Sequence, residues 1–169
     1  PIHPMLTNGL VNNIAFKALT IMGLTPIWII LYFLFKPDFS SVSMTGILLA
    51  IPAMIMAFFI GYLLSASITA LAFWTTRIYS VHEFYFALIL LFSGQFVPLT
   101  LMPPVIQNIA QYLPFQLLIY YPIQLILGKL STQQIVQGYM MIFIWLGISM
   151  FLFNWVWRNG VKRYSAVGA

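Results

Sequence analysis

The chain has 169 residues, of which 62% are hydrophobic and only 5% are charged, whereas about a quarter of the residues of a soluble protein are charged. This composition indicates a membrane protein, and with two carboxylates, two histidines and no cysteine we expect no catalytic residue, cofactor or metal ion, because such sites need several of these groups together. The net charge of +5 does not indicate nucleic-acid binding, because a few cations between long apolar runs are typical of topology signals beside anionic lipid headgroups.

The first 16 residues differ from the rest of the chain. The chain begins at Pro1 without an initiator methionine or a signal peptide, so we expect a piece of a longer protein. Leu6, Leu10 and Ile14 alternate with asparagines, a pattern that predicts a short amphipathic helix. This helix could lie on the inner membrane surface or dock on a soluble partner, and the sequence leaves both interpretations open.

Charged residues mark where the chain meets water, because a charge at the bilayer centre costs about 3 kcal/mol or more. Lys17 and Lys36 enclose an uncharged run close to the roughly 20 residues that one helical span needs. The same reasoning predicts an all-α polytopic membrane protein, a single transmembrane domain with four spans at residues 18–35, 44–73, 82–98 and 135–157. Trp155 and Trp157 lie where interfacial aromatic anchors are expected.

The second expected span carries small residues at every fourth position. They are Ala53, Ala57, Gly61, Ser65 and Thr69. Small side chains on one face let another helix approach closely. We expect close packing there, either within this chain or against another subunit.

A short polar turn separates the second and third expected spans. It holds Arg77, His82 and Glu83, and we place it at the inner membrane boundary. We interpret these groups as anchoring charges with local pairing, because the ionisable residues of a proton relay usually lie deep in the membrane.

The segment Ser93-Gly94-Gln95 resembles part of the LSGGQ signature of ABC ATPases, but it lies in a long apolar run. That signature binds the γ-phosphate in a hydrated setting, so we interpret the match as accidental. Gly128-Lys129 likewise lacks the other residues of a P-loop. We expect Ser93, Gly94, Gln95 and Pro98 to end a helix, either inside the bilayer or at its surface.

The region between the third and last spans is apolar but interrupted by prolines, among them Pro98, Pro103, Pro104 and Pro114. Its uninterrupted runs are too short to cross a bilayer, since runs of about 10 to 14 residues are more often re-entrant or interfacial. We expect outward-facing helices of this kind over 105–127, at about 105–113 and 115–127. Four spans then place Arg77 and the tail cations Arg158, Lys162 and Arg163 on the inner side, as the positive-inside rule favours.

Several stretches together resemble the permease subunits of the ABC-2 family of bacterial ABC transporters. They are Phe73-Trp74-Thr75-Thr76-Arg77, residues 93–99 with Met102-Pro103-Pro104, Leu113-Pro114-Phe115-Gln116, Gly128-Lys129, and the tail from Trp157-Arg158 through Gly160, Lys162-Arg163-Tyr164-Ser165-Ala166 to Gly168. The similarity covers nearly the whole chain. Their order and spacing make the joint match more specific than any one stretch.

The resemblance implies a six-span permease of which this chain holds the third to sixth spans. It implies that residues 1–16 are the coupling segment that meets the ATPase, and that 105–127 correspond to the family's outer re-entrant helices. It further implies export in the bacterial cytoplasmic membrane, driven by separate ABC ATPase subunits, with a second, identical or paralogous, permease subunit.

Two other functions are compatible with the sequence. A secondary transporter or channel fragment would follow an ion gradient, although central ionisable residues are lacking. A membrane scaffold subunit would bind partners without a transport path. The transported substrate and the residues that contact it do not follow from any motif.

Overall fold

The computed structural model describes residues 4–36, 39 and 42–165. Every regular element in this part of the chain is helical, in the order α1 (Pro4–Phe35), α2 (Met44–Ala70), η1 (Leu71–Phe73), α3 (Ile78–Phe92), η2 (Leu99–Leu101), α4 (Pro104–Ala110), α5 (Phe115–Leu118), α6 (Tyr120–Ile126) and α7 (Thr132–Ser165). Contacts divide the chain into two units, Pro1–Ser41 and Val42–Ala169. An all-helical fold is confirmed.

The first unit consists of α1, which is continuous from Pro4 to Phe35. We expected a surface segment over 1–16 and a separate span over 18–35, but the helix passes through Lys17 without a break. The physical reason is local, because Ala15, Phe16, Lys17 and Ala18 can all be accommodated in a helix interior. Part of the expected surface segment, residues 1–3, and most of the turn over 37–41 lie outside the described residues.

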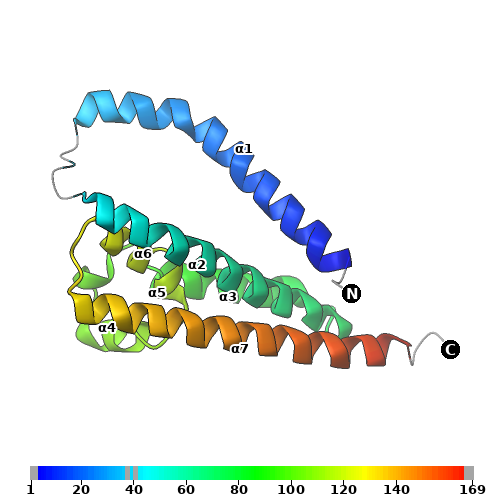
Figure 1. Cartoon of the computed structure of the whole chain (residues 1–169). Coiled ribbons are helices and arrows are strands. Elements are labelled where there is room, and N and C mark those ends of the chain that lie inside the picture. Colours follow the sequence, from blue (N-terminus) through cyan, green and yellow to red (C-terminus); the bar gives the residue numbers. More distant parts are fainter. Residues whose placement is uncertain (1–3, 37–38, 40–41, 166–169) are drawn as a thin grey trace. The chain divides into compact units, whose positions relative to one another are not determined.

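In the second unit α2 and α7 run side by side in the same direction (Figure 1). Near their first turns the Tyr139 hydroxyl on α7 donates to the Leu49 carbonyl on α2. At the other end Phe73 of η1 meets Trp157 of α7 edge to face, with ring centroids 5.8 Å apart. The two long helices therefore stay in contact from one end to the other.

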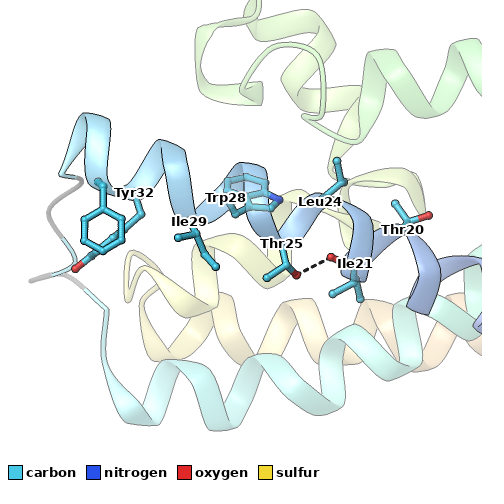
Figure 2. A pocket seen from close by; sticks show the side chains of 8 residues that line it. Thr20, Ile21, Leu24, Thr25, Trp28, Ile29 and Tyr32 are labelled. Carbon is cyan, nitrogen blue, oxygen red and sulfur yellow. Dashed lines mark hydrogen bonds between the residues drawn. The ribbon is translucent and has the colours of Figure 1, made fainter.

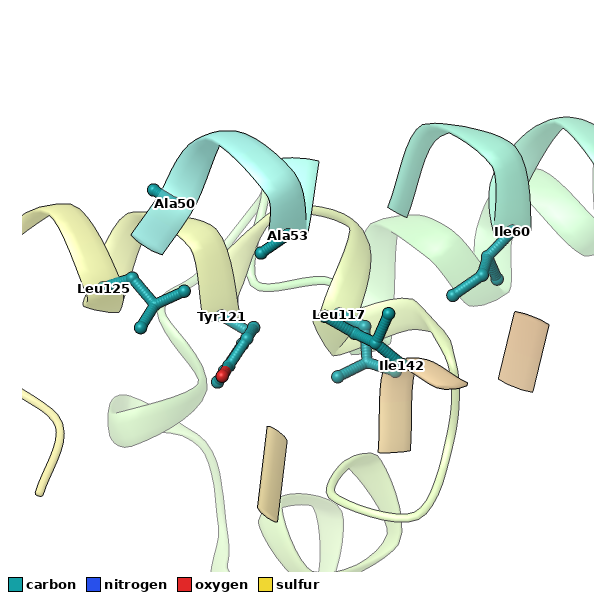
Figure 3. Close-up of a cluster of buried hydrophobic side chains, with 7 residues drawn as sticks. All are labelled: Ala50, Ala53, Ile60, Leu117, Tyr121, Leu125 and Ile142. Carbon is teal, nitrogen blue, oxygen red and sulfur yellow. The ribbon is translucent and has the colours of Figure 1, made fainter. Parts of the chain in front are cut away.

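The short helices α5 and α6 pack against α2, and α7 completes the same core (Figure 3). The core residues are Ala50, Ala53, Ile60, Leu117, Tyr121, Leu125 and Ile142. The small side chains lie on α2, whereas the large ones come mostly from α5, α6 and α7. This combination lets the short helices approach the α2 backbone closely.

The expectation of four spans is not confirmed. By length and composition α1, α2 and α7 could each cross a membrane, whereas α3 is a shorter apolar helix. The 15 residues of α3 extend about 22 Å, less than the roughly 30 Å of a hydrocarbon core. Instead of covering 82–98, α3 begins at Ile78 and ends at Phe92.

Three short helices, not two, occupy the region from 105 to 127. Ile119 separates α5 from α6 with φ −133° and ψ −58°, outside the helical range. Pro122 does not interrupt α6 because it lies in the first turn, where the proline nitrogen has no intrahelical bond to lose.

The last helix is longer than the expected span over 135–157. α7 begins at Thr132 and continues to Ser165, with Lys162 and Arg163 in its last turn. Its 34 residues extend about 51 Å. Lys162 and Arg163 therefore lie on the helix itself. The part of α7 that precedes them is longer than the roughly 20 residues that a span needs.

Candidate functional site

The end of α3 is bonded to the start of α6. Ser93 follows the last residue of α3, and its backbone nitrogen donates to the Ile89 carbonyl at 2.9 Å. Its own carbonyl accepts from the Tyr120 nitrogen at 3.1 Å, and its hydroxyl accepts from the Gln95 nitrogen at 3.2 Å. Ser93 is completely buried. The Ser93 carbonyl, the Tyr120 nitrogen and the Gln95 nitrogen lie at helix ends, where a regular helix offers them no partner, and these three backbone groups are hydrogen-bonded inside the protein.

Gly94 makes this turn sterically possible. Its φ is +76°, and a Cβ there would lie 3.3 Å from the Tyr120 side chain. Both observations favour glycine, because other residues rarely adopt this backbone conformation. The local geometry explains Ser93-Gly94-Gln95 as a helix end.

The end of α6 explains the second apparent nucleotide motif in the same way. Gly128 has a φ of +62°, and its nitrogen donates to the Leu125 carbonyl while the Lys129 nitrogen donates to the Gln124 carbonyl, each at 3.1 Å. These two bonds and the glycine conformation are those of a Schellman cap. Gly128-Lys129 ends a helix here, and Lys129 is exposed.

The expected residues Gln95, Pro98, Pro103 and Pro104 are exposed. Pro98 precedes η2, whereas Pro103 and Pro104 start α4. The remaining proline of the set, Pro114, is buried and precedes α5. The structure therefore brings Ser93 and Gly94 together with α6, and it leaves most of the other expected positions at the surface.

The contact between α6 and α7 centres on Tyr121. Its hydroxyl donates to the Ile135 carbonyl at 2.8 Å, and its ring lies edge to face with Tyr139 at 6.2 Å. A Cβ at Gly138 would overlap the Tyr121 ring. The ring therefore lies directly against the α7 backbone, and only glycine fits there without a shift.

Tyr139 continues this contact to α2. Pro52 lacks the N–H that would bond the Leu48 carbonyl in a regular helix, and the Tyr139 hydroxyl donates to the next carbonyl, that of Leu49. A hydroxyl from α7 thus binds α2 at its proline-modified turn. Helices α2, α6 and α7 are joined through Tyr121 and Tyr139.

The small-residue set of α2 is only partly buried. Ala53 and Ala57 are buried, Gly61 and Ser65 are half-buried, and Thr69 is exposed. A Cβ at Gly61 would make ordinary contact with Leu118 at 3.5 Å. Each residue of an α-helix turns about 100°, so a strict four-residue spacing moves about 40° around the helix at every step.

Sequence reasoning missed several residues of the buried face of α2. The buried positions are Gly46, Ala50, Ala53, Ala57, Ile60, Ser67 and Ala70, with the alternating three- and four-residue spacing of a helix face. At Gly46 a Cβ would overlap the Leu125 carbonyl oxygen, so the backbones of α2 and α6 lie close together there. A search at a period of 3.6 would have found this face.

The charges expected at the inner boundary lie at the start of α3 and at the end of α7. Arg77 precedes α3, and both Arg77 and Glu83 are exposed. Arg158, Lys162 and Arg163 are exposed on the last turns of α7. His82 lies 3.1 Å from the Thr69 hydroxyl, and this contact joins α3 to α2.

The last part of α7 lies close to η1. A Cβ at Gly160 of α7 would overlap the ring of Phe73 in η1.

A hollow of about 520 Å³ opens beside α5, α6 and the first turns of α7. Its polar lining includes five glutamines, Gln111, Gln116, Gln124, Gln134 and Gln137. Three tyrosines, Tyr112, Tyr120 and Tyr121, also line it, and none of the lining residues is charged. Sequence reasoning did not single out these glutamines, which are distributed over several short elements.

A second hollow of about 480 Å³ lies along α1 and is predominantly apolar (Figure 2). It is lined by Thr20, Ile21, Leu24, Thr25, Trp28, Ile29, Tyr32 and Phe33. The Thr25 hydroxyl donates to the Ile21 carbonyl at 2.7 Å, so it can only accept a hydrogen bond from a ligand. In the described part of the chain, no group of three or more His, Cys, Asp or Glu side chains could hold a metal ion.

The family described as ABC-2 family transporter protein matches residues 2–168. The chain belongs to this family. The ABC-2 chain is thus a multi-pass membrane protein and a permease component of an ABC transporter, a component distinct from the ATPase. The family also implies association with ABC ATPase subunits. Neither the curated proteins nor the solved structures yielded a match to this ABC-2 chain.

Proposed function

We propose that this ABC-2 chain is the membrane-spanning part of an ATP-driven exporter in the bacterial cytoplasmic membrane. The observation that carries the proposal is the family match over residues 2–168. Three long apolar helices support it. Separate ABC ATPase subunits hydrolyse ATP, and a second permease subunit, identical or paralogous, completes the translocation pathway.

The topology has four crossings, with α3 as the short third one. The bonds from Ser93 to Tyr120 and Gln95 support this arrangement, because a helix can end at membrane depth only where protein or water satisfies its backbone. α4, α5 and α6 then form the outward-facing re-entrant region above α3. Arg77 and the cations at the end of α7 lie on the inner side.

The N-terminal part of α1 couples ATP hydrolysis to the membrane domain. Residues 1–16 contact the ATPase, and the helix continues into the first span. Continuity of α1 through Lys17 supports direct coupling, because no loop separates the N-terminal part of the helix from the start of the span. ATP can shift the equilibrium between the two states of the transporter only if it binds one state more tightly than the other.

The small residues of α2 have two roles. Ala53 and Ala57 pack inside this chain against the short helices, as their burial supports. Ser65 and the exposed Thr69 lie on the part of α2 that is available to another subunit. Gly61 lies between these regions, where a Cβ would contact Leu118.

Purification of the complete gene product from its native membrane tests the function. We expect mass spectrometry to find a stoichiometric ABC ATPase, and ATP-dependent loss of cargo from cells to stop when that ATPase is made hydrolysis-inactive. Transport that follows an ion gradient without an ATPase would support a secondary transporter instead. Stable partners without any transport would support a scaffold subunit.

A further inference from the structure

The glutamine-lined hollow has the chemistry of a binding site for an uncharged polar group. It lies where α6 meets the start of α7, at the end of the core that contains the buried ring of Tyr121. Its volume of about 520 Å³ is within the range of about 300–1,000 Å³ typical of small-molecule sites.

Three of the lining amides have no protein partner. The side chains of Gln116, Gln124 and Gln137 make no hydrogen bond to any residue within the described ranges, and each lines the hollow. Every such amide offers two donors and one acceptor. Gln116 and Gln124 are half-buried, whereas Gln137 is exposed at the edge of the hollow. Polar groups that are partly withdrawn from water and left unpaired by the protein require water or a ligand.

The other two glutamines are partly used by the fold. The Gln111 side-chain nitrogen donates to the Asn108 side-chain oxygen at 3.5 Å. The Gln134 side-chain oxygen Oε1 accepts from the Ser131 backbone nitrogen at 2.9 Å, and the Ser131 hydroxyl accepts from the Gln134 backbone nitrogen at 3.4 Å. This capping box fixes the first turn of α7. The Gln134 side chain is thereby held at the rim of the hollow, with its amide NH₂ still able to donate.

The tyrosines and the apolar lining add a second type of contact. Tyr112 and Tyr120 have no hydroxyl partner among the residues that the structure describes, whereas the Tyr121 hydroxyl is occupied by Ile135. The rings of these three tyrosines can stack on the C–H face of a sugar or lie along an acyl chain. Met140 and Met141 provide an apolar, adaptable surface beside the amides.

We propose that this hollow binds an uncharged, hydroxyl-rich headgroup, such as a sugar that is free or attached to a lipid. Hydroxyl groups both donate and accept, which matches amides and phenols. A phosphate or ammonium ligand would remain without a counter-charge, since none of the lining residues is charged. A purely apolar ligand would leave the glutamine amides unpaired.

The test uses the purified transporter with its partner subunits in phosphatidylcholine nanodiscs, without ATP. Binding is measured by native mass spectrometry and by tryptophan fluorescence, with four probes: monoglucosyl diacylglycerol, the parent diacylglycerol, phosphatidylglycerol and free maltose. We expect the glycolipid or maltose to bind, and the other two lipids to bind at least tenfold more weakly. Binding of the glycolipid alone identifies a lipid-linked source, whereas binding of maltose identifies a free sugar.

Substitutions assign binding to the hollow. Gln124→Leu and Gln137→Leu keep the side-chain size but remove the amides, and each is expected to weaken binding of the sugar-bearing probe about tenfold. Gln95→Leu is the matched control at an exposed glutamine outside the hollow. A milder variant, Gln116→Met, gives a third amide deletion if either leucine variant fails to assemble.

Two results would overturn the proposal. One is equal affinity of the control and the amide-deleted variants for the sugar-bearing probe. The other is tighter binding of phosphatidylglycerol or diacylglycerol than of any sugar-bearing probe. Because binding is measured without ATP, a negative result here is independent of the direction and the energy source of transport.

Discussion

The backbone nitrogen of Tyr120 donates to the carbonyl oxygen of Ser93 at 3.1 Å, joining the start of α6 to the end of α3. The two residues lie on elements that are separated by η2, α4 and α5. The bond satisfies one acceptor and one donor that the helix ends leave free. It also requires a sharp turn after Ser93, which Gly94 provides.

Gly94→Ala should therefore destabilise the second unit. The backbone conformation of Gly94, at φ +76°, costs a residue with a Cβ about 1–2 kcal/mol, and the added methyl would also press on Tyr120. Thermal unfolding of the detergent-solubilised protein, followed by fluorescence, should show a lower midpoint. Gly147→Ala is the control, because a Cβ there meets nothing within 4 Å; equal midpoints would contradict this interpretation.

Gly46→Ala should have a larger effect than any other glycine-to-alanine change in α2. The added methyl would overlap the Leu125 carbonyl oxygen, and a backbone atom cannot move aside as a flexible side chain can. Overpacking of this kind costs about 1–3 kcal/mol. The measurement is the thermal midpoint together with the yield of monodisperse protein, and a variant indistinguishable from the parent would show that α2 and α6 separate easily.

Substitutions at Gly61 test how closely α2 packs against Leu118. Gly61→Ala should be tolerated, because its Cβ would lie at an ordinary contact distance of 3.5 Å from Leu118. Gly61→Leu should weaken folding or assembly, because the longer side chain must displace Leu118 by overpacking. Size-exclusion profiles and transport of both variants are compared, and unchanged assembly and activity of Gly61→Leu would exclude close packing at this position.

Tyr139→Phe should loosen the contact between α7 and α2. The change removes the hydroxyl that binds the Leu49 carbonyl, and a hydrogen bond of this kind contributes about 1 kcal/mol. Tyr121→Phe should cost a similar amount through the lost bond to Ile135. The rings of Tyr121 and Tyr139 are in contact, so the double variant should depart from additivity; strictly additive unfolding midpoints would show that the two bonds act independently.

Cysteine labelling tests the orientation of the re-entrant region. The chain contains no cysteine, so a single introduced thiol is the one site of labelling within it. In intact cells Lys129→Cys should react with a membrane-impermeant maleimide, whereas Arg163→Cys should react only with a permeant one. Labelling of Lys129→Cys by the permeant reagent alone would place α6 and the start of α7 on the inner side.

The local character of the chain could be predicted without the structure. Long uncharged runs indicate helices in a membrane, because charges are costly there, and the run that starts at Met44 does form α2. Prolines limited α4, α5 and α6 to short lengths, since each of these helices has a proline at its cap or in its first turn, where proline is favoured. The family resemblance, carried by residues distributed over the chain, is confirmed by the match over 2–168.

The sequence alone thus determined that this is an apolar, helical ABC-2 permease chain, because charge, proline and motif patterns act over a few residues. Only the tertiary structure decided that Gly46 meets Leu125 and that Gly138 meets Tyr121. It also decided that glutamines from α5, α6 and α7 and the turn after α4 line one hollow. These relationships depend on the rotation and position of whole helices, and a helix turns about 100° with every residue, so neighbours across elements follow from packing and not from spacing along the chain.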